Sequence, residues 1–198
     1  MHVIHLLVAA LAVAVTFARP AAAEPALSIR PLAEKKVAAL PDGALYWRIE
    51  TFATHEDAAA AAGPLSLVVE SAGATWLFTL GASGASTPGA RRVAEVGPIP
   101  RVEAAEYLLR INEATGAPGA VTPVHTHPGS EAFYVLSGEQ SIRGSRGALR
   151  VVRAGEAEAG SGADHAMQVS SSGAAPLHAL VMFVVDAKRP FSSPSALQ

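Results

Sequence analysis

Alternation of apolar and polar residues dominates the second half of this 198-residue chain. From residue 103 onward, short segments rich in β-branched and aromatic residues are separated by turns, which is typical of strands. The pattern predicts strands at residues 106–112, 121–126, 131–136, 139–143, 148–152, 156–159, 165–169 and 177–185. Many short strands at regular spacing predict a closed or double-sheet antiparallel fold, and eight is the number in a jelly roll. The last strand is apolar on both faces, so we expect it to be central.

The first half of the chain is also rich in strand patterns, predicted at residues 45–52, 65–70, 75–80 and 93–96. One short helix is predicted between them, at residues 54–62. Thr54 can cap this helix, Asp57 lies three residues further on, and the pair Gly63-Pro64 ends it. Residues 32–40 could form a second short helix or an ordered arm, and the pattern leaves both open.

Two histidines one residue apart, His125 and His127, are followed four positions later by Glu131. Because successive strand side chains point to opposite faces, the two imidazoles project from the same face. The turn at residues 128–130 reverses the chain, so Glu131 opens the next strand and can return to that side. Two imidazoles and a carboxylate on adjacent strands predict a metal site of the 2-His-1-carboxylate kind.

The spacing of these residues resembles the first conserved motif of the cupin superfamily, G-x5-H-x-H-x3-E-x6-G. Its fixed positions are occupied by Gly119, His125, His127, Glu131 and Gly138. The resemblance implies an all-β, cupin-like antiparallel jelly-roll barrel, here with an N-terminal strand-rich extension and one short helix. It covers roughly the last two fifths of the chain.

The family's second motif, G-x5-P-x-G-x2-H-x3-N, supplies one more histidine ligand, and its candidate here is residues 155–165. Gly162 and His165 match this motif, whereas Gly160 replaces the proline and Val169 replaces the asparagine. The metal set that the resemblance implies is His125, His127, Glu131 and His165. A barrel that has lost its metal is the alternative, although polar groups facing a barrel interior cost several kcal/mol unless they are paired or coordinated.

Strand alternation also suggests the walls of a pocket around this metal. Phe133 and Val135 share a face with Glu131, and Met167 shares a face with His165. These side chains would form an apolar lining or simply belong to the core, and both interpretations stay open. Nitrogen and carboxylate ligands suit one divalent transition metal, which could be Fe, Mn, Ni, Cu or Zn.

Two classes of function follow from such a site. The first is a metal-dependent enzyme acting on a small molecule, and the resemblance suggests an oxygenase or a related isomerase or decarboxylase. The second is a non-enzymatic cupin that binds a small ligand or a metal. No catalytic residue is predicted, because no acid–base pair stands near the motif. The resemblance also implies a homodimer formed through sheet edges.

The composition and the N-terminal pattern limit which partners the protein can have and indicate where it is located. A net charge of −2 gives no electrostatic footprint for nucleic acid, and the absence of cysteine excludes disulfides and thiolate ligands. Residues 3–17 form an apolar run, too short to span a membrane, and Ala21 to Ala23 follow as a cleavage pattern. We therefore expect a secretory signal peptide and a periplasmic or secreted protein that keeps no membrane contact after leader cleavage.

Together these patterns divide the chain into four segments. They are a signal peptide at residues 1–23, a strand-rich extension packing on the barrel at 24–102, a cupin barrel at 103–187 and a polar tail at 188–198. An independent N-terminal domain is the alternative for the second segment.

Overall fold

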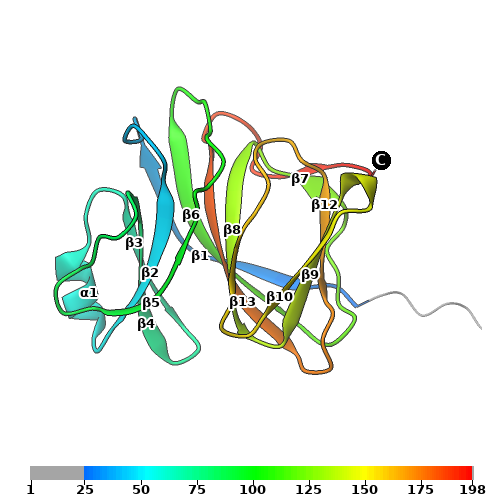
Figure 1. The fold of residues 1–198 in the computed structure, drawn as a ribbon, viewed down its shortest axis with the longest axis horizontal. Helices are drawn as coiled ribbons and strands as arrows, with labels where there is room; N and C mark the ends of the chain where they lie inside the picture. The colour runs from blue at the N-terminus through cyan, green and yellow to red at the C-terminus, as the bar shows by residue number, and fades with distance from the viewer. Residues whose placement is uncertain (1–24, 198) are drawn as a thin grey trace, which may run out of the picture.

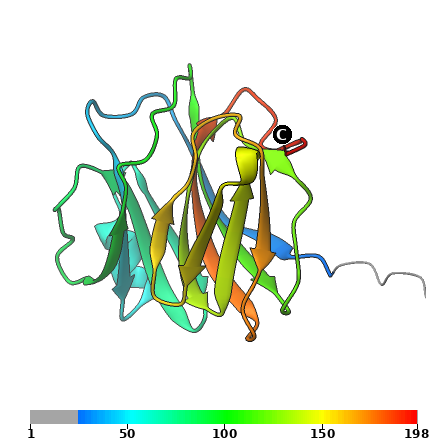
Figure 2. The same cartoon turned by 45° about the vertical axis from the view of Figure 1, so that its right-hand side comes forward.

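The computed structural model describes residues 25–197, so the predicted signal peptide lies outside the described residues. The described chain folds into three antiparallel sheets and one α-helix. Figure 1 shows the sheet formed within residues 46–96, in cyan to green, beside the other two sheets, which face each other, and Figure 2 shows the same arrangement from a second direction. Within residues 25–197 no helix is long and apolar enough to cross a membrane. The predicted all-β fold with one short helix is confirmed.

The barrel consists of two five-stranded sheets, which we call the central sheet and the outer sheet. The central sheet has the order β1 (Ser28–Val37), β6 (Tyr107–Gly116), β13 (Leu177–Asp186), β8 (Gly129–Ser137) and β11 (Ala157–Ala159). The outer sheet has the order β10 (Leu149–Arg153), β9 (Glu139–Gly144), β12 (Met167–Ser171), β7 (His125–Thr126) and β14 (Ser193–Pro194). A single 3-10 turn, Ser145–Gly147, connects β9 to β10.

The third sheet, which we call the N-terminal sheet, is four-stranded. Its order is β3 (Ser66–Ser71), β4 (Ala74–Gly81), β2 (Tyr46–Phe52) and β5 (Arg91–Val96). The helix α1 (His55–Ala61) connects β2 to β3, and the Thr54 hydroxyl accepts a hydrogen bond from the Asp57 backbone N–H as predicted. This N-cap satisfies one backbone donor that the first helical turn leaves free.

The central sheet is buried on both faces, and this explains the composition of β13. Ala179, Val181 and Phe183 point toward the outer sheet and belong to the barrel core. Leu180 and Met182 alternate with them and pack in a second core against the N-terminal sheet. A strand covered on both faces gains nothing from polar residues on either side, so β13 lies in the middle of its sheet as predicted.

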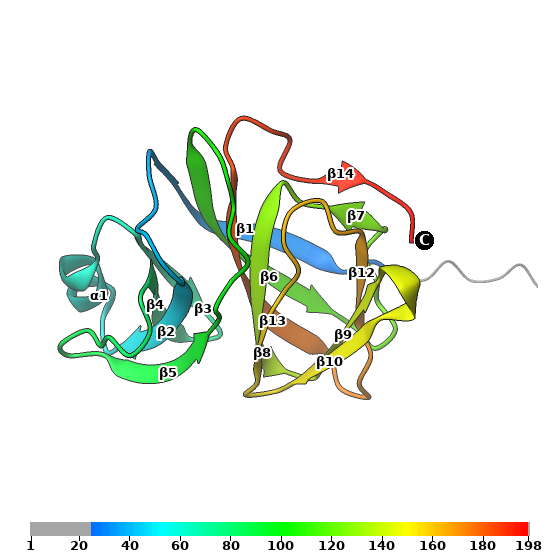
Figure 3. The ribbon, with the colours of Figure 1, turned by 45° about the horizontal axis from the view of Figure 1, so that its top comes forward.

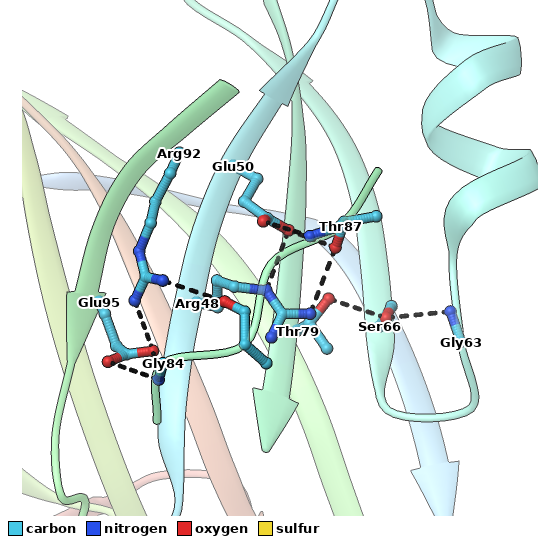
Figure 4. A network of polar contacts seen from close by, with 10 residues as sticks. Arg48, Glu50, Gly63, Ser66, Thr79, Gly84, Thr87, Arg92 and Glu95 are labelled. Carbon is cyan, nitrogen blue, oxygen red and sulfur yellow. Dashed lines mark hydrogen bonds and ion pairs between the residues drawn. The ribbon is translucent and has the colours of Figure 1, made fainter. Parts of the chain in front are cut away.

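Polar contacts also hold the N-terminal sheet together from within (Figure 4). Glu50 accepts hydrogen bonds from the backbone N–H and the hydroxyl of Thr87, at 3.0 and 2.6 Å. Its Oε2 also lies 3.1 Å from Nε of Arg48, an ion pair whose geometry is not that of a hydrogen bond. The buried carboxylate is therefore paired, and it ties the loop before β5 to β2.

Each predicted strand has an observed counterpart, but three segments differ from the prediction. Residues 32–40, left open between a helix and an arm, instead contribute to β1, which pairs with β6. Only His125–Thr126 of residues 121–126 form a ladder, and β12 begins at Met167 rather than at residue 165. Strand β1 owes its conformation to a partner about 80 residues away, which no local pattern can reveal.

Candidate metal and ligand site

A cavity of about 380 Å³ lies within the barrel and takes its walls from both sheets. This volume falls in the range of small-molecule sites in proteins. Most of its lining is apolar, and the polar minority includes the motif residues. The lining residues are Ile29, Asn112, Ala114, Thr122, Pro123, Val124, His125, His127, Glu131, Phe133, Gln140, Val169, Val181, Phe183, Phe191, Ser192 and Pro194.

The two motif histidines lie side by side on this cavity, as their alternation predicts. Their ring centroids are 4.9 Å apart and the rings are nearly perpendicular, at 85°. Nδ1 of His125 donates to the carbonyl of Pro123 at 2.9 Å, and Nδ1 of His127 donates to the carbonyl of Phe191 at 2.6 Å. With Nδ1 protonated, Nε2 of each neutral ring carries the free lone pair that a metal needs.

The environment of His127 favours the neutral ring. Burial lowers its pKa to about 4, and the nearby positive charges of His125 and Arg110 act in the same direction. The carbonyl of Phe191 opposes this shift without cancelling it. Because a metal binds only the neutral imidazole, His127 is prepared as a ligand at neutral pH without first losing a proton.

Glu131 reaches the same cavity from β8, on the opposite sheet. Its side chain is only 3% exposed, and its Oε1 is buried without a hydrogen-bond partner among the described residues. Burial raises the pKa of this carboxyl to about 8, although Arg150 pulls in the opposite direction. A side chain on Gly160 would lie 2.7 Å from the Glu131 Cγ, so the glycine that replaces the motif's proline leaves room for this carboxyl.

The donor set fits a cation at two ligands. Nε2 of His127 and Oε2 of Glu131 are 3.9 Å apart, within the roughly 4.2 Å that two ligand bonds to one ion can span. Within residues 25–197, however, no three His, Asp or Glu side chains stand close enough to enclose an ion as they are placed. His125 is half-buried and its ring centroid lies 4.9 Å from that of His127, which makes it the candidate for a third ligand.

The structure does not bring His165 to these three residues. The residue is exposed and lines a different cavity, together with Arg150 and Ser161. The alternation expected for residues 165–169 does not apply, because Asp164 adopts a left-handed φ of 62° in a turn and the strand starts only at Met167. Two hydrogen bonds from Arg189 to Asp164 hold this turn.

Of the three residues predicted to line the pocket, one lines the cavity and two belong to the core. Phe133 lines the cavity beside the motif residues. Val135 and Met167 are buried in the barrel core instead and do not line it. Both face the interior as alternation requires, but the interior is filled where they lie, so the second of the two interpretations holds for them.

Gln140 and Phe191 are among the lining residues that were not predicted. Gln140 is the second residue of β9, and its alternation with the buried Ile142 is the signal that could have indicated an inward amide. Phe191 comes from the segment predicted to be a polar tail. Its ring packs 4.8 Å from that of His127 and 4.9 Å from that of Phe183, and β14 just after it pairs with β7 (Figure 3).

Comparison with known proteins agrees with this geometry. Residues 112–183 match the family model of the cupin domain, and this segment runs from β6 to β13 with both motif histidines and Glu131 inside it. The two facing sheets and this match identify residues 112–183 as a cupin domain. No curated protein sequence matches the chain.

Similar solved structures each cover less than half of this chain. An uncharacterized protein with a double-stranded β-helix domain from Klebsiella pneumoniae is 19% identical, with a TM-score of 0.39, over 44% of this chain and 75% of that one. A cupin-like protein from Thermotoga maritima is 15% identical, with a TM-score of 0.40, over 45% and 65%. An oxalate oxidase in complex with glycolate is 26% identical, with a TM-score of 0.37, over 43% and 45%. The chain thus spans less than two thirds of the length of the Thermotoga maritima protein and of the oxalate oxidase.

Proposed function

We propose that the barrel cavity binds one divalent transition metal through His125, His127 and Glu131 and accepts a small, largely apolar molecule beside it. The observation that carries the proposal is the buried carboxyl of Glu131, whose Oε2 lies 3.9 Å from the free ring nitrogen of His127. The other oxygen of this buried carboxyl has no partner within residues 25–197, which is costly unless a ligand supplies the missing contact. A bound cation would reverse the effect of burial and favour the ionised carboxylate.

The types of ligand restrict the bound ion to a group of transition metals. Two imidazoles and one carboxylate without sulfur suit Fe, Mn, Ni, Cu or Zn. Such a metal supplies Lewis acidity and open coordination positions for a substrate or water. The chain itself contributes the orientation of His127 through the Phe191 carbonyl and an apolar wall, with Phe133, Phe183 and Phe191, that excludes water. A metal-dependent enzyme such as an oxygenase is the function that these features support best.

A non-enzymatic ligand-binding cupin is the second candidate. It is favoured by the position of His165 outside the cavity, which leaves at most three side-chain ligands from the predicted set. It is also favoured by Glu131, since a carboxyl with a pKa of about 8 can stay neutral at pH 7 without a cation. Binding without turnover would then be the property of the cavity.

Metal content tests the proposed metal site in a first experiment. The purified protein is loaded with each of the five metals in turn, dialysed and analysed for metal by mass spectrometry. We expect one equivalent in the wild type and in His165→Ala, and loss in His127→Ala and Glu131→Gln. Co(II) absorption of the loaded protein gives an independent readout, since its ligand-field bands report the donor set. Full metal content in Glu131→Gln would remove this carboxyl from the site.

We also propose that residues 1–23 direct export and that the mature protein works in the periplasm or outside the cell. The support is the apolar run followed by three alanines. Expression of the full chain in a bacterium, followed by mass determination of the exported protein, tests this. A mass that begins at Glu24 is expected, and an unprocessed cytoplasmic protein would contradict the proposal. The same preparation gives the oligomeric state by light scattering, for which we propose a homodimer.

A further inference from the structure

Gln140 is the most isolated polar side chain in the cavity. It is fully buried, and neither its amide nitrogen nor its amide oxygen has a hydrogen-bond partner among the described residues. It lies on β9, paired with Val152 of β10 and Ser171 of β12, so the outer sheet fixes its backbone on both sides. Its side chain lines the same cavity as Glu131, which comes from the opposite sheet.

We propose that Gln140 holds the polar head of the ligand, and that this head is an uncharged group with a donor beside an acceptor, as in a carboxamide or a lactam. This inference rests on the proposed small-molecule site but not on its metal. A glutamine presents an N–H donor and a carbonyl acceptor side by side, and both are unused here. One amide-like group satisfies both atoms at once, whereas a simple ketone or ether satisfies only the donor.

The charges around the cavity favour a neutral head over an anionic one. No Lys or Arg is among the described residues that line the cavity. Arg110 lies close to the cavity, but its guanidinium is committed to Glu34 at 2.8 Å, to the Asn112 carbonyl at 2.7 Å and to the Phe191 ring. A carboxylate would also place a negative oxygen against the Gln140 carbonyl, leaving that acceptor unsatisfied.

Asn112 adds a second donor to the same wall. It is buried and lines the cavity, and its side-chain oxygen already accepts from Nε of Arg110. Its NH2 group and the second lone pair of its oxygen remain for another partner. The rest of the lining is mainly aliphatic and aromatic, so the body of the ligand is apolar. The structure thus assigns the cavity a compact apolar molecule with one amide-like head.

Three aromatic probes of nearly equal shape test this assignment. Benzamide carries donor and acceptor, acetophenone carries only the acceptor, and benzoate carries a charge. Binding is measured by calorimetry on EDTA-treated full-length protein, so that no metal contributes. We expect benzamide to bind at least about tenfold more tightly than the other two probes, since these leave the buried Gln140 carbonyl unpaired and an unpaired buried acceptor costs that much.

Gln140→Leu should remove this preference by bringing benzamide to the affinity of acetophenone, which itself should not weaken. Gln140→Met, which has nearly the same length and neither amide atom, is the second variant if the first does not fold, and it should lose the preference in the same way. Gln168→Leu is the matched control, because Gln168 lies on the neighbouring strand and bonds the Thr122 carbonyl instead. It should keep the preference. The ligand-free Gln140→Leu protein should be at least as stable as the wild type, because it removes two unpaired buried atoms.

Several results would overturn the inference. One is an equal affinity of the wild type for the three probes, or no binding of any. Another is a Gln140→Leu protein that is less stable and keeps its preference, which means that water or packing satisfies the amide. A preference seen only with metal, and lost in Glu131→Gln but not in Gln140→Leu, assigns the head to the metal. Failure of the metal proposal alone leaves the preference of the EDTA-treated protein intact, so the two failures are distinguishable.

Discussion

The N-terminal sheet and the barrel cavity bury polar side chains in opposite ways. In the N-terminal sheet Glu50 is 1% exposed, and both of its carboxylate oxygens have partners. In the cavity Glu131 is 3% exposed, and its Oε1 has no hydrogen-bond partner within the described chain. The amide nitrogen and oxygen of Gln140 have no partner there either. Burial of a polar group therefore does not indicate a binding site by itself. The missing partner does, because the cost of desolvation is then left for a ligand to offset.

Two residues depart from this contrast. Within the described chain the buried indole N–H of Trp47 and the buried hydroxyl of Ser130 have no partner although neither lines the cavity, and nothing in the structure explains them. Glu113 resembles Glu50, because its carboxylate has partners. It lies where the N-terminal sheet meets the central sheet, a region we call the seam. It lies on β6 and contacts Ser71 of β3 and His178 of β13. Burial alone would raise its pKa, but hydrogen bonds from Ser71, Arg30 and His178 outweigh this and lower it to about 2.

The largest effect is expected where a paired charge loses its partner. Glu50→Ala leaves the largely buried guanidinium of Arg48 without its carboxylate, and we expect a loss of about 3–5 kcal/mol in the free energy of unfolding. Urea denaturation measures it. Glu95→Ala is the control, because its partner Arg92 is well exposed and the same removal should cost under about 1 kcal/mol. A cost for Glu50→Ala no greater than the control would break the comparison.

The second prediction concerns the pH dependence of the metal-free cavity. The folded pKa of Glu131 lies above its unfolded value, so its contribution is lost as pH rises toward about 8. His127 has the opposite sign, since its pKa of about 4 costs stability only as pH falls below about 6.5. The two oppose each other below pH 6.5, and above it only the Glu131 loss remains, about 2 kcal/mol up to pH 8.

Denaturation in EDTA at several pH values between 6.5 and 8 measures this slope. In Glu131→Gln the group cannot titrate, so its slope should vanish. Saturating metal should flatten the wild-type curve as well, because the ionised carboxylate is then the bound form. Identical curves for wild type and Glu131→Gln in EDTA would show that Glu131 does not titrate in this range. Its carboxyl would then have a partner, contrary to the comparison with Glu50.

A smaller effect, with a pH dependence opposite to that of Glu131, is expected for Glu113. The pKa of Glu113 is depressed, so its stabilisation is present above about pH 4.5 and is lost as pH falls toward 2. We expect Glu113→Gln to cost about 1–2 kcal/mol at pH 7 and to be closer to the wild type at pH 3, because the side chain keeps some contact with solvent. A cost that does not shrink in acid would mean that the carboxylate charge contributes nothing.

The smallest effect is expected where a polar contact is exposed. Thr54→Ala removes the N-cap of α1, and we expect a loss of about 0.5–1 kcal/mol. Thr54→Ser keeps the hydroxyl and should stay within about 0.5 kcal/mol of the wild type. Thermal unfolding followed by circular dichroism measures both. Equal losses in the two variants would assign the effect to the methyl group rather than to the cap.

Local sequence patterns predicted much of this molecule. The N-cap and its helix were predictable because Thr54 and Asp57 act within one turn. The juxtaposition of His125 and His127 was predictable because alternation in a strand is local. The same rule failed at His165, where a left-handed Asp164 interrupts the strand. Alternation holds only while the ladder continues, and its ends depend on the neighbouring strands.

The sequence alone determined the class of fold, the helix α1, the central place of β13 and the pair of histidines, because each depends on neighbours within a few residues. Only the tertiary structure decided that residues 28–37 form a strand, that Phe191 returns to contact His127 and that Gln140 is left without a partner. These features depend on contacts between segments distant in the chain. A residue's own pattern shows which way it points, but the fold decides what it meets there.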